Sequence, residues 1–401
     1  MRSPTRIRPS IAFMVLAALL TTGFQITAGR VEAQVTVRTR AGEVSGRVQD
    51  AAVMLLPFQA GHVAVRWAGN PNAEVSVATS VDRVTFGAAI DVGRDETGEQ
   101  KGNGVSYGAI LTAGGATAVR ITSNVPLGVV TVLALKDGER VTSYRHVPGR
   151  PAGASLTQPA TISRAVWGAD ESLRFGPHGT EAWGPTEFWP SKKLIVHHTA
   201  GSNNDLNPAA TIRSIYYYHT VTQGWGHIGY NFLIDEAGKV YKGRYSGPAG
   251  TRDADTISGE NALGHGVTAA HSYQFNSGTV GVALLGTLTT RDATASARSA
   301  LVEHLAWEAE HHGIDPNGRS EYVNPVNGTR KVFDNIAGHR DVSATECPGG
   351  TFYDTLPGLR TSVASRIAAG TTVAPTTTTT SVSTTTTVAP TTTTLRRGKK
   401  R

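Results

Sequence analysis

A change of hydrophobic pattern near residue 150 is the feature that most limits how this chain can fold. Before it, apolar and polar side chains alternate in short runs such as His62-Val63-Ala64-Val65-Arg66-Trp67, a period of two that is typical of half-buried β-strands. After it, strand-like runs are interspersed with segments whose apolar residues recur at helical spacing. The 401 residues are also too many for one ordinary hydrophobic core. We therefore expect two folded domains of different class.

The first domain, residues 34–158, is predicted to be an all-β, sandwich-like domain. Its strand-like runs are separated by Gly, Asn, Pro and Asp, and none of them has a helical period. Lys136-Asp137-Gly138-Glu139 is predicted to be a hairpin turn, because Asp and Gly accept the positive φ angles of a tight turn. The domain contains no cluster of catalytic residue types, so a carbohydrate- or wall-binding role and a plain spacer role both stay open.

The second domain, residues 159–370, is predicted to be of the α/β class, with a mixed central β-sheet flanked by helices. Lys193-Leu194-Ile195-Val196-His197 is a short apolar run suited to a buried strand, and it ends on two adjacent histidines. Asn207-Pro208 favours the start of a helix, with Asn as the N-cap and Pro in the first turn. Residues 279–285 are predicted to form a doubly covered strand, and residues 295–312 a helix that Gly313 ends.

The two ends of the chain are predicted to lie outside both domains. Residues 1–33 have the arginines, the apolar run and the small residues that are typical of a secretory signal peptide. A short membrane anchor is the alternative, but the apolar run is shorter than the roughly 20 residues that a span requires. The mature chain, starting at Gln34, is then expected to be released without a transmembrane segment. Residues 371–401 are predicted to be a disordered, Thr-rich tail with a basic end.

The net charge of +7 comes from these two ends. Residues 1–33 carry a net +3 and the last six residues carry +5, which leaves −1 for everything between them. A folded body of this charge has no basic footprint for DNA or RNA, so no nucleic-acid partner is expected. The basic end of the tail instead suits the anionic polymers of a cell wall.

A single cysteine in an exported chain is unusual, because oxidising compartments favour pairs that form disulfides. Cys347 is therefore a core thiol, an intermolecular link or a metal ligand. It follows His339 by eight residues, in a loop broken by Gly and Pro, so the two side chains can meet at one metal ion. A catalytic zinc site with one open position requires a third ligand, and the adjacent His197 and His198 are the best source.

Five segments of the second domain resemble, in the same order, the motifs of peptidoglycan recognition proteins, a family that shares its fold with phage lysozyme-type N-acetylmuramoyl-L-alanine amidases. The resemblance covers about residues 160 to 368 and leaves the first domain and the tail outside. The segments are Ile162-Ser163-Arg164-Ala165-Val166-Trp167-Gly168-Ala169, Ile195-Val196-His197-His198-Thr199-Ala200, Trp225-Gly226-His227-Ile228-Gly229-Tyr230-Asn231-Phe232, Asn276-Ser277-Gly278-Thr279-Val280-Gly281-Val282-Ala283 and the loop from Gly338 to Gly349.

The resemblance implies a role for particular residues of these segments. It makes His197, His339 and Cys347 the ligands of Zn²⁺, Tyr230 the catalytic tyrosine, and Thr345 the occupant of a second catalytic position that holds Lys or Thr in relatives. It also makes His198, His271 and Asn276 substrate-binding residues that line a groove.

Four other histidines of this domain are not expected to bind the metal. His219 lies on the apolar face of its helix and is predicted to be a core residue. His304, His311 and His312 lie on the predicted helix 295–312 without metal-ligand spacing, and are predicted to be solvated.

The function that the resemblance implies is that of a secreted, zinc-dependent N-acetylmuramoyl-L-alanine amidase associated with the cell wall. Such an enzyme hydrolyses the amide bond between N-acetylmuramic acid and the L-Ala of the peptidoglycan stem peptide. Family members that only bind peptidoglycan typically lack the cysteine ligand, whereas Cys347 is present here. A non-catalytic peptidoglycan-binding protein stays open as an alternative, as does a wall-adhesion module that works through its first domain and its tail.

Overall fold

The computed structural model describes residues 30–94, 104–147, 156–176, 178–248, 250–251 and 254–372. Residues 1–29 of the expected signal peptide and residues 373–401 of the expected tail lie outside the described residues, so both segments remain predictions. Within the described ranges, no helix is both long and apolar enough to cross a membrane.

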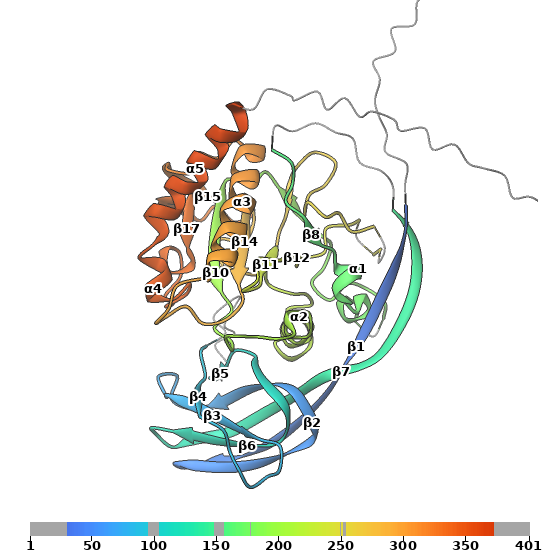
Figure 1. Cartoon of the computed structure of the whole chain (residues 1–401), viewed down its shortest axis with the longest axis vertical. Helices are drawn as coiled ribbons and strands as arrows, with labels where there is room; N and C mark the ends of the chain where they lie inside the picture. The colour runs from blue at the N-terminus through green and yellow to red at the C-terminus, as the bar shows by residue number, and fades with distance from the viewer. Residues whose placement is uncertain are drawn as a thin grey trace, which may run out of the picture.

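The N-terminal part is all β, as predicted, and its seven strands form a single antiparallel sheet (Figure 1). The sheet order is β1-β7-β2-β6-β3-β4, and β5 pairs with β2. The strands are β1 (Arg30–Val48), β2 (Ala51–Ala68), β3 (Val75–Ser80), β4 (Ile90–Asp91), β5 (Val105–Tyr107), β6 (Leu111–Ser123) and β7 (Leu127–Val147). We call residues 30–147 the β region.

The sheet of the β region curls over its own apolar face. Val63, Val65 and Trp67 alternate along β2 and are all at most 1% exposed, which places every second side chain in one core. A Cβ atom added at Gly42 of β1 would lie 2.8 Å from the Pro57 ring of β2, although these strands are not neighbours in the sheet order. In a β-sandwich the core lies between two packed sheets, whereas here it lies inside one curled sheet.

The hairpin turn predicted at Asp137-Gly138 is wrong, because β7 runs through both residues. Strand β1 pairs with β7 along its whole length, and the register shifts between Val37 and Thr39, where Asp137 pairs with Thr39. A Cβ atom at position 138 would lie 2.7 Å from the carbonyl oxygen of Arg38. Glycine here permits a close backbone approach at a bulge rather than a turn.

The C-terminal part is α/β with a mixed central sheet, as predicted. Its sheet order is β17-β10-β14-β11-β12-β8. Strand β10 is parallel to β14 and β17, whereas β11 and β12 are antiparallel to each other. The strands are β8 (Thr161–Ile162), β10 (Lys193–His198), β11 (Phe232–Ile234), β12 (Val240–Lys242), β14 (Thr279–Leu284) and β17 (Ile336–Gly338).

Helices cover both faces of this sheet, which explains why its strands are apolar without alternation (Figure 1). The α3 (Ala295–His312) and α5 (Leu356–Thr372) helices share one core with Phe232 and Ile234 of β11. Leu233, between them, points to the other face and packs with α2 (Pro208–Tyr217). Asn207 caps α2 by accepting a hydrogen bond from the amide of Ala210, as the sequence predicts.

Shorter elements complete the described part of the C-terminal domain. They are α1 (Arg164–Trp167), a 3₁₀ turn (Glu171–Arg174), β9 (Phe188–Trp189), a π turn (Tyr218–Thr222), β13 (Gly266–Val267), β15 (Arg319–Val323), β16 (Arg330–Asp334), a 3₁₀ turn (His339–Asp341) and α4 (Gly350–Tyr353).

Helix α3 has the predicted bounds and His311 is exposed as predicted, but the side chains of His304 and His312 are not solvated. His304 is 0% exposed and lies against the rings of Phe232 and Trp307. The side chain of His312 is 6% exposed and lies 3.4 Å from a carboxylate oxygen of Glu260. The prediction was wrong for these two residues because His304 packs against Phe232 of the central sheet and the segment that contains Glu260 covers His312. A helical pattern does not show which distant segment will pack on each of its faces.

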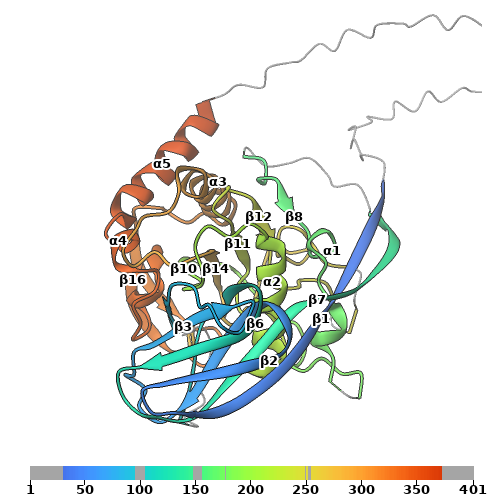
Figure 2. The same cartoon turned by 60° about the horizontal axis from the view of Figure 1, so that its bottom comes forward.

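The β region packs directly against the α/β domain. Strands β1 and β7 run beside α1 and α2 (Figure 2). The amide of Val37 donates a hydrogen bond to the carbonyl of Gly168, and Arg213 of α2 forms an ion pair of 2.6 Å with Asp137 of β7. Leu133 and Leu135 of β7 belong to the same apolar cluster as α2. The two parts therefore share a core, which places the β region beside the end of the sheet where β10 finishes.

Candidate metal centre

Two neighbouring parallel strands bring His197 and His339 together. Strand β10 ends with His197 and His198, and β17 ends immediately before His339. Val196 pairs with Gly338 in the parallel ladder, so the next residue of each strand emerges at the same edge of the sheet. Cys347 returns to this edge after the 3₁₀ turn. The possible ligand atoms of His197, His339 and Cys347 all lie within 4.8 Å of one another, and all three residues are buried.

The loop that contains Cys347 is held by its own hydrogen bonds. The amide of Cys347 donates to Oγ1 of Thr345 at 2.9 Å, and the amide of Arg340 donates to the carbonyl of Cys347 at 2.9 Å. The amide of His198 points at Sγ of Cys347 from 3.4 Å. A donor aimed at the sulfur favours the thiolate, which is the form that binds a metal.

The ring of His197 has a defined orientation. Its Nε2 lies 3.0 Å from Nδ1 of His271, and its Nδ1 lies 3.7 Å from Sγ of Cys347. On the other side of His271, Nε2 lies 3.2 Å from Oγ1 of Thr279. With Nε2 of His197 as the donor to His271, Nδ1 keeps its lone pair directed towards Cys347.

These histidines are neutral at physiological pH. Burial lowers the pKa of His197 well below its usual value, and the nearby rings of His339 and His271 lower it further. Burial also lowers the pKa of His271 to about 3 and that of His198 to about 4. Metal ligation requires neutral imidazole, so the lowered pKa of His197 keeps this ring ready for a metal ion.

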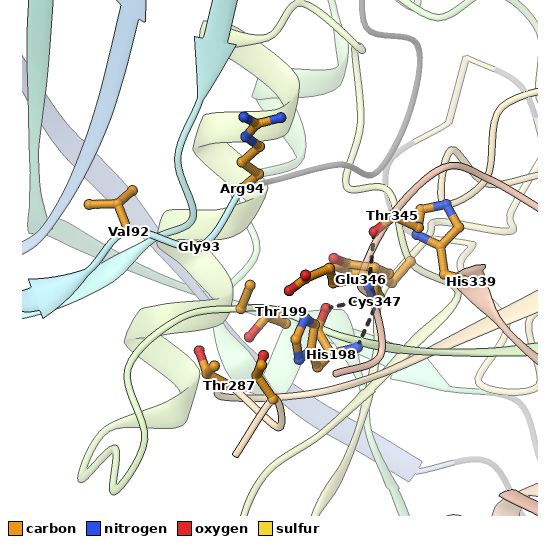
Figure 3. Close-up of a pocket in the computed structure, with 13 residues that line it drawn as sticks. Val92, Gly93, Arg94, His198, Thr199, Thr287, His339, Thr345, Glu346 and Cys347 are labelled. Carbon is orange, nitrogen blue, oxygen red and sulfur yellow. Dashed lines mark hydrogen bonds between the residues drawn. The ribbon is translucent and has the colours of Figure 1, made fainter. Parts of the chain in front are cut away.

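A cavity of about 340 Å³ lies over the cluster, and Figure 3 shows the side chains around it. His339 and Cys347 form part of its floor, together with His198 and Thr345. Tyr230 also lines it; this residue precedes β11, is 2% exposed, and its ring centre lies 5.5 Å from that of His197. A cavity of this size is within the range of small-ligand sites.

The structure separates the predicted site residues into two groups. His198, Tyr230 and Thr345 line the cavity beside the His197, His339 and Cys347 cluster. His271 is 0% exposed behind His197 and is not among the residues that line the cavity, so its contact with a substrate stays a prediction. The side-chain oxygen of Asn276 accepts a hydrogen bond from the amide of Ser272, and the residue is not among those that line the cavity. His219 is buried and accepts a hydrogen bond from the amide of Gly229, as expected for a core histidine.

Sequence reasoning missed part of the cavity wall. Val92, Gly93 and Arg94 of the β region line the cavity opposite Thr345 and Glu346 (Figure 3). No local signal marks them, because they follow an ordinary short strand and lie far along the chain from the histidines. Only the packing of the two parts brings them to the site.

Comparison with known proteins identifies the family. The profile of the family described as N-acetylmuramoyl-L-alanine amidase matches residues 188–350. Peptidoglycan-recognition protein SC2 of Drosophila simulans is 31% identical over 164 residues, which are 40% of this chain and 70% of that protein. Peptidoglycan recognition protein 1 of Bos taurus is 30% identical over 209 residues, 50% of this chain and 84% of that protein. The N-acetylmuramoyl-L-alanine amidase of Homo sapiens is 31% identical over 207 residues, 51% of this chain and 29% of that protein. This chain therefore belongs to the family of peptidoglycan-recognition proteins and N-acetylmuramoyl-L-alanine amidases.

Proposed function

We propose that this protein is a zinc-dependent N-acetylmuramoyl-L-alanine amidase, which hydrolyses the amide bond between N-acetylmuramic acid and the L-Ala of the peptidoglycan stem peptide. The observation that supports this most strongly is the buried cluster of His197, His339 and Cys347 under an open cavity. Membership of the family supports the substrate class, and the ligand cluster supports catalysis rather than binding alone.

The chemistry of the three side chains fits zinc. Two imidazole nitrogens and one sulfur are ligands that suit this ion, and hard cations such as Mg²⁺ prefer oxygen. Three protein ligands leave a fourth position open towards the cavity, as in catalytic rather than structural zinc sites. Bound zinc would polarise the scissile carbonyl and lower the pKa of water to about 7. His271 would fix the His197 ring from behind.

Two hydroxyl groups are placed to assist the reaction. We assign Tyr230 to donate a hydrogen bond to the carbonyl oxygen of the scissile amide as negative charge develops on it. Thr345 is the second candidate; its oxygen already accepts from the amide of Cys347, so its own hydrogen can be donated into the cavity. His198 lines the same cavity, and we keep it as a substrate-contacting residue.

Location and wall attachment are further parts of the proposal. The signal-peptide features of residues 1–33 support secretion, and the target polymer is extracellular. The +5 charge of the last six residues supports association with anionic wall polymers.

The decisive experiment is the incubation of purified protein with soluble peptidoglycan fragments, followed by mass spectrometry. Release of free stem peptides that begin with L-Ala is the expected product, and removal of metal by a chelator should stop it. Binding of the fragments without any release, in protein with a full complement of zinc, would instead identify a peptidoglycan-binding protein.

A further inference from the structure

The β region forms one wall of the metal cavity. The segment Val92-Gly93-Arg94 follows β4 and lies across the cavity from His339, Thr345 and Cys347 (Figure 3). The site is therefore shared between the two parts of the chain. The profile match to the amidase family begins only at residue 188, so this wall is an addition to the matched domain.

The wall is held tightly against the loop that follows β10. A Cβ atom at Gly93 would lie 2.8 Å from both the Cβ and the carbonyl oxygen of Ala200. One residue further, a Cβ atom at Gly201 would lie 2.5 Å from the carbonyl oxygen of Ile110. The amide of Thr112 donates to Oγ of Ser202 at 3.0 Å. Glycine on both sides of the contact lets the two backbones touch, so the wall has a defined position next to the metal cluster.

Arg94 brings a positive charge to this wall. It is partly buried, and no hydrogen bond or ion pair joins its guanidinium group to any residue of the described ranges. Glu346 lines the same cavity, but within those ranges no ion pair connects it with Arg94. Both residues also line a second hollow of about 570 Å³ on the β region, so Arg94 lies where the two hollows meet.

We propose that Arg94 is a specificity-determining residue that binds a free carboxylate of the peptide part of the substrate. This inference rests on the proposed function, because it takes the scissile amide to lie over the metal cluster. On one side of that amide lies a sugar whose hydroxyl and acetamido groups are uncharged, and on the other side lies a peptide with free carboxylates. A guanidinium group donates two parallel hydrogen bonds to a carboxylate and so selects for it over a neutral amide.

The test uses synthetic stem peptides, which lack the scissile bond and are not consumed. One peptide has free carboxylates, and in the other these groups are carboxamides. Their dissociation constants are measured by calorimetry with zinc-loaded wild-type protein and with the Arg94→Gln and Arg94→Lys variants. Arg47→Gln is the matched control, because Arg47 is exposed on β1 of the same region and lines neither hollow.

Wild-type protein should prefer the acid peptide, and Arg94→Gln should weaken its binding about tenfold while leaving the amidated peptide unchanged. Arg94→Lys should keep part of the preference, and Arg47→Gln all of it. Equal binding of both peptides by wild-type protein, no binding of either, or an Arg94→Gln variant that behaves like wild type would overturn the inference.

Hydrolysis of muramoyl peptides, measured on the same samples, separates this inference from the proposed function. Preference for the acid peptide without hydrolysis would leave the carboxylate site intact and refute the amidase. Normal hydrolysis, together with an Arg94→Gln variant that binds the acid peptide like wild type, would support the amidase and refute the carboxylate site.

Discussion

Nε2 of His197 lies 3.0 Å from Nδ1 of His271, and this contact determines which nitrogen of His197 faces Cys347. The space for the His271 ring exists because residue 281 has no side chain: a Cβ atom there would lie 2.3 Å from Cγ of His271. Position 281 is in β14, in the middle of the sheet, where the backbone cannot move away. The absence of a side chain at position 281 thus helps to orient His197, one of the proposed zinc ligands.

Gly281→Ala should displace His271 and weaken zinc binding about 10- to 100-fold, which is the usual cost of losing the partner of a metal-binding histidine. His271→Ala should have a similar effect. Zinc affinity is measured by competition with a chromogenic chelator. The matched control is Gly358→Ala in α5, where an added Cβ atom meets nothing within 4 Å. Wild-type zinc affinity in both the Gly281 and His271 variants would show that this contact does not support the ligand.

Cys347→Ser should lose both hydrolysis and most of the bound zinc. A serine hydroxyl stays protonated at neutral pH and is a poor ligand, whereas the thiolate binds zinc strongly. The loss of zinc affinity should exceed the roughly 100-fold that indirect partners of a metal site contribute. Elemental analysis and the peptide-release assay measure the two effects. A variant with one zinc per chain and normal turnover would disprove the assignment of the site.

Tyr230→Phe should keep zinc but lower turnover about 100-fold or more, since it removes one hydrogen bond to the developing oxyanion. The ring stays in place, so fragment binding and thermal stability should hardly change. The measurement is kcat at saturating fragment, with zinc content as the control. Unchanged kcat would reduce Tyr230 to a packing residue beside His197.

Protein kept metal-free with a chelator should lose stability as the pH falls below about 6.5. Burial lowers the pKa of six histidines of the described ranges in the native state, whereas in the unfolded chain they titrate near 6.5. Below that pH the unfolded chain binds protons that the native state does not bind. Each group therefore lowers the free energy of unfolding by about 1.4 kcal/mol per pH unit until its native pKa is reached. They are His62 and His198, with a pKa of about 4, His271 and His304, with a pKa of about 3, and His197 and His227, whose pKa lies well below the usual value.

Thermal unfolding at pH 7 and pH 5 tests this expectation. The melting temperature should be lower at pH 5, and the difference should shrink in a His304→Gln variant, which removes one of these titrating groups. His312 opposes the trend, because the hydrogen bond and charge of Glu308 outweigh burial and raise its pKa. Equal melting temperatures at the two pH values would contradict the prediction.

Deleting residues 373–401 should leave the cleavage of small soluble fragments unchanged, because helix α5 and the whole site are kept. Retention on intact cell walls should fall at low ionic strength, since the five positive charges at the end of the tail are lost. At high salt the two proteins should behave alike. Wall pull-down at both salt concentrations measures this, and equal retention at low salt would remove the tail from the proposal.

The sequence alone determined the classes of the two parts, the bounds of helix 295–312 and the grouping of His197, His339 and Cys347. Each of these depends on local information: the period of apolar residues, a helix-ending residue such as Gly313, or a short motif around each proposed ligand. A helix or strand with one buried face has apolar residues at a regular spacing along its own sequence, whichever segment covers that face.

The tertiary structure decided what covers each face and which side chains meet. It turned Asp137-Gly138 from an expected turn into the middle of β7, because β1 offers a partner along the whole strand. It buried His304 and placed His271 behind His197. It also brought Arg94 to the cavity. These contacts join residues that are distant in the sequence, and their stability comes from packing between whole elements, which no local pattern records.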